Sequence, residues 1–191
     1  MWKLRDIIVA VVLSAVCGAI YMGWDWLFGV VATGLNPVLQ AAFNGLWWLA
    51  AGLVPYIIRR PGAALLSEVA SAAFEFVFGS PYSLGAILSG VLQGLGAEIG
   101  FALGRWRRYN MGIMMLSGAL AGLGYSVQAY FQYGANHYSH GVLVGFVLVS
   151  MLSGAVLGGA LPKWIGDALY RTGSLQNFES ARQVRRQQQE R

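Results

Sequence analysis

Two apolar stretches of the sequence contain acidic and amide side chains, and these are the first residues from which chemistry is expected. Glu68 and Glu75 lie within residues 62–79, and Gln93 lies within residues 83–104. Each stretch is close to the length of about 20 apolar residues that crosses a bilayer. A carboxylate near the bilayer centre costs roughly 2.5–3.5 kcal/mol, so it needs a partner or a ligand. The sequence therefore predicts a polar site inside a membrane protein.

The composition of the chain is that of an integral membrane protein. Of its 191 residues, 57% are apolar and 11% are charged, whereas about 25% of the residues of a soluble domain are charged. We predict an all-α bundle of six transmembrane helices, a multi-pass protein of the cell membrane, specifically the bacterial plasma membrane. The six apolar runs occupy residues 7–28, 37–58, 62–79, 83–104, 111–133 and 141–161.

The basic residues predict the orientation of the bundle. With six spans, all 13 Lys and Arg residues fall on one side, and the opposite connections, residues 29–36, 79–83 and 134–140, contain none. Positive charge marks the cytoplasmic side, so both termini are predicted to be cytoplasmic. The net charge of +5 follows from this asymmetry, and we expect no nucleic-acid partner. We assign residues 1–170 to the transmembrane domain and residues 171–191 to a basic, Gln-rich cytoplasmic tail.

Four of the predicted helices carry one polar face each. Residues three or four positions apart share a helix face, and polar side chains within a membrane face the protein interior. Because these faces lie largely in the outer half of the bundle, they predict a polar cavity that opens to the outside. The four sets are Gln40, Asn44 and Trp47; Glu68, Ser71 and Glu75; Ser89 and Gln93; and Tyr125, Gln128 and Gln132.

The side chains of this predicted cavity suit a small, flat ligand. A buried carboxylate beside aromatic faces matches a cationic or amine-bearing heterocycle. For Glu75, ligand binding is favoured over a structural pair. An interfacial aromatic belt is the favoured interpretation of Trp24, Trp26, Tyr82 and Tyr133. The predicted substrate-binding residues are Asn44, Trp47, Glu75, Gln93, Tyr125 and Gln128.

Other polar residues are expected to serve the fold. Glu68 and Glu98 lie nearer the cytoplasmic side, and we expect them to form internal hydrogen bonds that stabilise the bundle. His137 and His140 lie in an outer connection, where they fit a solvated segment or a lid better than a metal site. We predict no metal and no cofactor.

Small residues recur at helical spacing in two of the predicted spans. Ser150, Gly154 and Gly158 form a ridge on the last span, for which packing inside the bundle is the favoured interpretation. The first span carries two overlapping pairs, for which internal packing and contact with a partner membrane protein are equally supported by the pattern. These pairs are Ser14 with Gly18 and Ala15 with Ala19.

The sequence lacks the motifs of several enzyme classes. It contains no G-x-x-x-x-G-K-[ST] phosphate-binding loop and no H-E-x-x-H zinc motif. Ser89 lacks a G-x-S-x-G frame, and both histidines lie outside the spans. We therefore predict that the chain is not an enzyme but a membrane protein that binds a small molecule. An autonomous secondary transporter or channel is the alternative.

Two segments resemble a known family. RRPGAALLSE at 59–68 with FE at 74–75, and GVLQGLGAE at 90–98, resemble the YkoE-type substrate-binding (S) components of energy-coupling factor (ECF) transporters. The resemblance implies capture of thiamine or its hydroxymethylpyrimidine precursor. It also implies a complex with a transmembrane T component and two ATP-binding-cassette ATPase units. Ala15 and Ala19 match the A-x-x-x-A pattern with which S components dock on the T component.

The expected mechanism has three steps. The ligand is captured at the outer face, an outer connection closes over it, and it is released inward when the ATP-driven partners reorient the bundle. The candidate lids are residues 29–36 and 134–140.

Overall fold

The computed structural model describes residues 2–82 and 84–172, and within these ranges the chain forms helices and connections without any strand. The helices are α1 (Leu4–Val31), α2 (Pro37–Ala41), η1 (Asn44–Trp48), α3 (Leu49–Ile58), α4 (Ala63–Val77), α5 (Leu84–Leu103), α6 (Met111–Gln132), η2 (Ala135–His137), α7 (His140–Ser153), η3 (Gly154–Ala160) and α8 (Leu161–Arg171).

The predicted apolar runs correspond to six helical stretches. Helix α1 exceeds its predicted range of 7–28 at both ends. The last stretch is continuous from α7 through the π-helical η3 to α8, and it ends at Arg171 rather than at the predicted 161. Most of the predicted cytoplasmic tail, residues 173–191, lies outside the described residues.

Four of the six stretches are long and apolar enough to cross a membrane. These are Leu4–Val31, Pro37–Ile58, Leu84–Leu103 and His140–Arg171. Helix α4 has 15 residues, so at about 1.5 Å per residue it is shorter than a hydrocarbon core of about 30 Å. Helix α6 is long enough with 22 residues, but it carries several polar side chains. The all-helical prediction is confirmed, with four candidate spans identified by length and composition.

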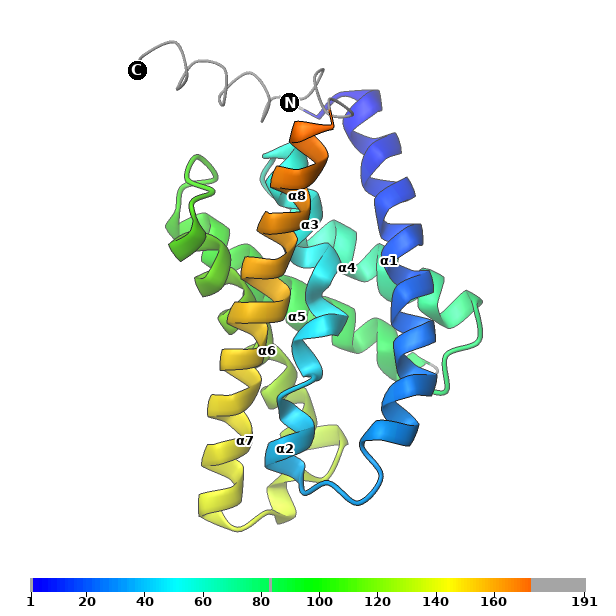
Figure 1. Cartoon of the computed structure of the whole chain (residues 1–191), viewed down its shortest axis with the longest axis vertical. Helices are drawn as coiled ribbons and strands as arrows, with labels where there is room; N and C mark the ends of the chain where they lie inside the picture. Colours follow the sequence, from blue (N-terminus) through cyan, green and yellow to red (C-terminus); the bar gives the residue numbers. More distant parts are fainter. Residues whose placement is uncertain (1, 83, 173–191) are drawn as a thin grey trace.

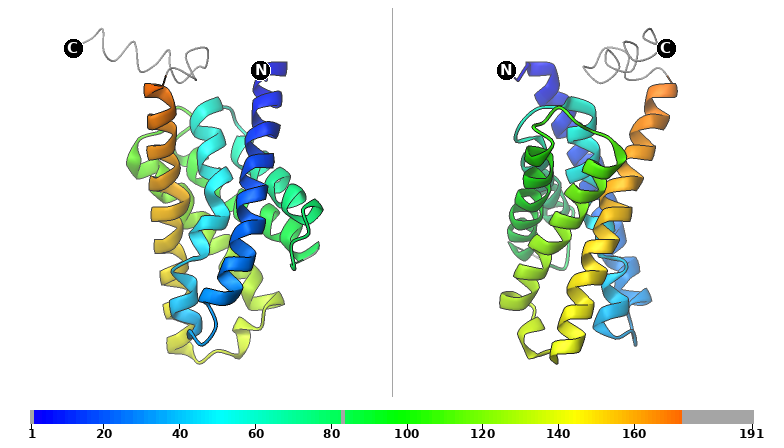
Figure 2. Two further views of the ribbon diagram at one scale, coloured as in Figure 1. Left: turned by 45° about the vertical axis from the view of Figure 1, so that its right-hand side comes forward. Right: turned by 90° about the vertical axis from the view of Figure 1, so that its left-hand side faces the viewer.

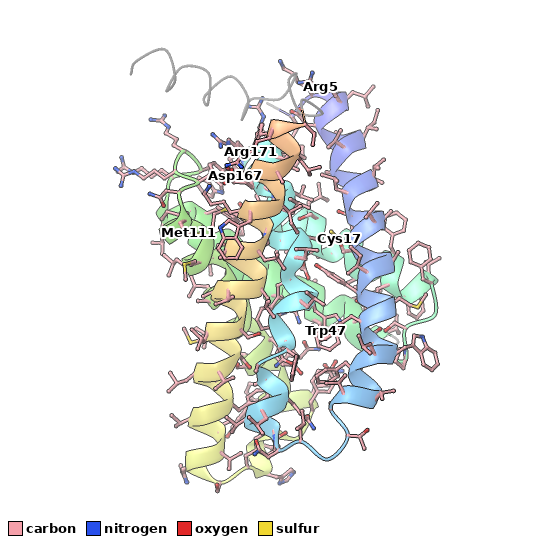
Figure 3. The ribbon with its side chains drawn as sticks, viewed as in Figure 1. Arg5, Cys17, Trp47, Met111, Asp167 and Arg171 are labelled. Atoms are coloured by element: carbon pink, nitrogen blue, oxygen red, sulfur yellow. The ribbon has the colours of Figure 1, made fainter. Side chains whose placement is uncertain are left out.

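The ends of the bundle differ in charge. The start of α1 and the end of α8 lie at the same end of the molecule, at the top of Figure 1 and in both views of Figure 2. Arg5 and Arg171 mark this end in Figure 3. We call it the basic end, because the connections with Arg59 and Arg105 also lie there. The connections that follow α1 and α6 lie at the opposite end.

Small residues allow two close backbone contacts. A Cβ atom added to Gly154 would lie 2.1 Å from the carbonyl oxygen of Gly118, so η3 and α6 approach as closely as only glycine permits. The predicted internal ridge of Ser150, Gly154 and Gly158 is thereby confirmed as packing. A Cβ atom on Gly18 would lie 2.7 Å from the Cβ of Phe74, so α1 packs closely on α4.

The second helical stretch is interrupted between α2 and η1, and Ser153 bridges the break. Its hydroxyl donates to the carbonyl of Ala42 at 2.7 Å and accepts from the backbone N–H of Gly45 at 2.9 Å. Backbone groups released by a break at membrane depth must find partners inside the protein. The break is therefore tolerated in the bundle interior, and it directs Asn44 and Trp47 toward an internal cavity.

Candidate functional site

A cavity of about 300 Å³ lies in the half of the bundle away from the basic end. This volume is at the lower limit of the roughly 300–1,000 Å³ found for small-molecule sites. Its walls combine aromatic rings with a few amide and carboxyl groups. The lining residues are Phe28, Gln40, Asn44, Trp47, Trp48, Glu68, Ala72, Glu75, Tyr82, Ala86, Ser89, Gln93, Tyr125, Ala129, Tyr133, Tyr138 and Phe146.

Five of the six predicted substrate-binding residues line this cavity: Asn44, Trp47, Glu75, Gln93 and Tyr125. They come from η1, α4, α5 and α6, so the polar faces converge. The sixth, Gln128, is not among the lining residues and is 2% exposed. Its side chain accepts from Ser89 at 2.6 Å and donates to Gln132 at 2.8 Å, so it ties α6 to α5 behind the wall.

Two amide side chains keep hydrogen-bonding capacity toward the cavity. The Gln93 side chain is 5% exposed, and its amide makes no hydrogen bond with another described residue. Because Gln93 lines the cavity, its amide donors and acceptor are open to a polar ligand. Asn44 donates to Ser150 at 3.3 Å through its amide nitrogen, which leaves its amide oxygen as an acceptor. The cavity thus offers both donors and acceptors.

Two carboxyl groups meet beside the cavity: Glu75 of α4, which lines it, and Asp25 of α1, which lies behind the lining residues. Ser80 Oγ lies 2.7 Å from Asp25 Oδ2 and 2.9 Å from Glu75 Oε1. The indole N–H of Trp47 donates to Asp25 Oδ1 at 2.7 Å. Asp25 is 3% exposed, so this acidic side chain is held inside the bundle. We call Asp25, Ser80 and Glu75 the carboxyl pair site.

Sequence reasoning missed Asp25 and Ser80. Asp25 stands at the end of a long apolar run between two tryptophans, and a lone carboxylate in such a run was the available signal. Ser80 gave no signal, because it lies in a short connection and its role depends on the packing of α1 against α4.

Aromatic rings enclose the cavity beside the carboxyl pair site. The ring centroid of Trp47 lies 5.0 Å from that of Phe28 and 6.3 Å from that of Tyr82, both edge-on. The belt interpretation fits Trp26, which is 67% exposed. Tyr82 and Tyr133 are 41% and 39% exposed, which also fits the belt, and both line the cavity as well.

Tyr82 stays uncharged in this position. Partial burial, and after it the neighbouring Asp25 carboxyl group, raise the pKa of the Tyr82 phenol above its usual value. The ring is therefore a neutral wall over the physiological pH range, and its negative π face remains available to a cation.

Glu68 makes the internal contacts that were expected of it, although it also reaches the cavity. Its Oε2 atom accepts from the Tyr21 hydroxyl at 3.2 Å and from the backbone N–H of Ala51 at 2.9 Å. These bonds join α1, α3 and α4. Glu68 therefore connects three helices at the inner limit of the cavity.

Glu98 caps the start of α4. It accepts from the backbone N–H groups of Gly62 at 2.6 Å and Ala64 at 3.0 Å, and from the Trp106 indole at 2.6 Å. An anion at a helix N-terminus is stabilised by the unpaired N–H groups and the helix dipole. Its role is structural, as predicted.

The two small-residue pairs of α1 face different ways. Ser14 and Gly18 are buried, and Gly18 packs on α4. Ala15 is partly exposed and Ala19 is exposed. The buried pair is thus used within the chain, and the second pair lies on the outer face of α1. Near the opposite end, His137 and His140 are both exposed, and the described residues hold no group of three or more side chains suited to a metal ion.

The fold and the cavity define an integral membrane protein with an internal site for a small molecule. Residues 5–124 match the family described as "ABC-type cobalt transport system, permease component". The "Putative HMP/thiamine permease protein YkoE" of Bacillus subtilis (strain 168) is 32% identical over 185 residues, which are 97% of this chain and 93% of that protein. A solved structure described as "Crystal structure of an S-component of ECF transporter" matches with a TM-score of 0.95 and 31% identity, covering 100% of this chain and 96% of that one.

The chain therefore belongs to the family of YkoE-type S components of ECF transporters. Its relatives are multi-pass membrane proteins that bind substrate and are not ATPases. The family confirms the predicted class of protein and does not favour an autonomous secondary transporter or channel.

Proposed function

We propose that this chain captures thiamine or its hydroxymethylpyrimidine precursor at the outer face of the membrane for ATP-driven uptake. The observation that carries the proposal is the cavity, in which aromatic rings, an unpaired amide and a carboxyl group face one space of about 300 Å³. An aminopyrimidine ring presents donors and acceptors to Gln93 and Asn44 and a flat face to Trp47 or Tyr125. The relative from Bacillus subtilis, described as an HMP/thiamine permease protein, supports the same two ligands.

The proposed topology has six spans with both termini in the cytoplasm. The basic end then faces the cytoplasm, and the cavity lies in the outer half. Helix α4 is too short to span the bilayer upright, but its carboxyl groups are shielded from lipid by α1, α3 and α5, with which it makes its main contacts. The segment 134–140 contributes Tyr138 to the cavity wall, whereas residues 29–36 contribute no lining residue. This favours 134–140 over 29–36 as the lid.

The proposed partners are a T component and two ATP-binding-cassette ATPase units. Family membership supports this assembly, because S components act with such subunits. On this chain the proposed docking pair is Ala15 and Ala19, because they lie on the outer face of α1 while Ser14 and Gly18 are buried against the bundle.

Titration of the purified chain by quenching of tryptophan fluorescence tests the proposed ligand. Trp47 and Trp48 line the cavity, so a bound heterocycle should quench them saturably. We expect tight binding of thiamine or hydroxymethylpyrimidine and no binding of riboflavin, which serves as the control. Absence of binding of both pyrimidines by protein shown to be folded would contradict the proposal.

A further inference from the structure

The geometry of the carboxyl pair site requires a proton. A serine hydroxyl has one hydrogen, yet Ser80 Oγ lies within 2.9 Å of oxygens of both Asp25 and Glu75. It can donate to one of them, and the other contact is favourable only if that carboxyl group carries an O–H. The empty site is therefore one of two carboxyl groups with a single shared proton.

Within residues 2–82 and 84–172, the Lys and Arg side chains belong to the basic end rather than to the depth of the carboxyl pair site. The sequence has no Lys or Arg between Arg5 and Arg59 or between Arg60 and Arg105. At about 1.5 Å per helical residue, Asp25 is roughly 30 Å along α1 from Arg5, and Glu75 is over 20 Å along α4 from Arg60. The pair is thus not neutralised by a neighbouring basic side chain. One bound proton lowers its charge from −2 to −1, and a monovalent cation in the proton's place has the same effect.

The rings beside the pair suit a positive charge. Phe28, Trp47 and Tyr82 line the same end of the cavity, and Trp47 is fixed by its hydrogen bond to Asp25. Aromatic faces attract cations, most strongly when both are removed from water. An aromatic enclosure next to two carboxyl groups is selective for a cationic group over a neutral one.

We propose that a ligand with one permanent positive charge replaces the proton shared by Asp25 and Glu75, so that its binding releases one proton to solvent, whereas a neutral ligand binds without proton release. The inference rests on the proposed function, because it concerns the same cavity. It extends that function by assigning the carboxyl pair site to the cationic part of the ligand. In the exchange the proton leaves through the cavity. The Glu75 carboxylate then faces the cation directly, and Asp25 lies behind it, joined to it through Ser80.

Other ionisable groups around the pair are few. On the cavity walls they are Glu68 on α4, Tyr82 in the next connection, Tyr125 on α6, Tyr133 directly after α6, and Tyr138 directly after η2. Cys17 and Tyr21 lie deeper on α1. Phenols do not ionise below about pH 9. Glu68 is the one group that could also release a proton, so the test must separate it from Asp25 and Glu75.

The test is calorimetric titration of the full chain with thiamine, a permanent cation, and with hydroxymethylpyrimidine, which is uncharged near neutral pH. Titrations in two buffers of different ionisation enthalpy give the number of protons released. We expect about one proton for thiamine and none for hydroxymethylpyrimidine. Because one proton is released, the thiamine affinity should rise with pH by up to about tenfold per pH unit for as long as the pair still holds its proton, and the hydroxymethylpyrimidine affinity should stay constant.

The Asp25→Asn variant tests the source of the proton. With one carboxyl group left, thiamine binding should release no proton and lose its pH dependence, while Asp6→Asn, on the same helix at the basic end, should behave as the wild type. Persistent release in Asp25→Asn would show that the released proton is not one shared by Asp25 and Glu75, and it would overturn the inference. Should Asp25→Asn fail to fold, the wild-type proton count decides alone.

The wild-type outcomes separate the two proposals. Thiamine binding without proton release, equal release by both ligands, or binding of hydroxymethylpyrimidine alone would overturn the inference and leave the proposed function standing. Binding of neither ligand would overturn both.

Discussion

The Trp47 indole on η1 donates a 2.7 Å hydrogen bond to the Asp25 carboxyl group on α1, 22 residues earlier in the chain. This bond links an aromatic wall of the cavity to the carboxyl pair site. Because the same Asp25 contacts Ser80, movement of α1 would disturb both the ring and the carboxyl groups. The partner proposed to dock on α1 would thus act on a helix that directly supports the ligand site.

Replacement of Glu75 by Gln should weaken thiamine binding. The substitution keeps the shape of the side chain and removes its charge, and a hydrogen bond to a charged group contributes about 1.5–3 kcal/mol, which is roughly a 10- to 150-fold change in affinity. Calorimetric titration measures the effect. Glu98→Gln is the matched control, because Glu98 caps α4 outside the cavity; it should lower thermal stability without changing affinity. Equal thiamine affinities of the wild type and Glu75→Gln would show that Glu75 does not bind the ligand.

Replacement of Trp47 by Ala should also weaken thiamine binding. A desolvated cation–π contact is worth about 2 kcal/mol, or roughly a 30-fold change in affinity. The control is Trp26→Ala, because Trp26 is on α1 and 67% exposed. Affinity is measured by calorimetry here, because each variant lacks one of the seven tryptophans and its fluorescence signal therefore differs from that of the wild type. An effect as large in Trp26→Ala would show that the loss is not specific to the cavity.

Two glycines on α1 should respond differently to the same substitution. Gly18→Ala should cost about 1–3 kcal/mol by overpacking, because its new Cβ would lie 2.7 Å from both Phe74 Cβ and the Ser71 carbonyl oxygen. Gly23→Ala should leave stability unchanged or raise it, because the new Cβ would have no atom within 4 Å apart from its own stretch of helix. Thermal unfolding of the isolated chain in detergent compares them. A stable Gly18→Ala variant would contradict the close packing of α1 on α4.

A bulky residue on the outer face of α1 should block assembly but spare ligand binding. We expect Ala19→Trp to lose co-purification with the T component, since small residues allow close helix contact in membranes. Leu88→Trp, at an exposed position of α5, is the control. Normal assembly of Ala19→Trp would place the docking surface elsewhere.

The sequence predicted the helical stretches and most of the cavity because both depend on local patterns. Helical spacing was sufficient to predict that Glu68 and Glu75 share one helix face and that the Gln93 side chain points into the bundle. It was not sufficient for Gln128, whose face is polar but whose amide is used by Ser89 and Gln132. Whether a polar side chain meets a ligand or a neighbour depends on the packing of two helices, and spacing along one helix does not contain that information.

The carboxyl pair site illustrates the same limit more strongly. Asp25 and Glu75 are 50 positions apart, and they meet because Gly18 lets α1 approach α4. The broken stretch from α2 to α3 also escaped prediction, because the apolar run 37–58 is continuous. The break depends on Ser153, which supplies the missing hydrogen bonds from a distant helix.

The central claim is that the ligand occupies this cavity. It is tested most directly by replacing a small residue of the cavity wall with a large one that fills the space. Ala86 is buried on α5 and lines the cavity, so Ala86→Phe should place a ring where the ligand binds. Thiamine and hydroxymethylpyrimidine affinity should then fall below detection by calorimetry, while the thermal stability of the empty protein stays equal or rises. Ala102→Phe, on the same helix near the basic end, should bind as the wild type does. Undiminished binding by a folded Ala86→Phe variant would show that the ligand lies elsewhere.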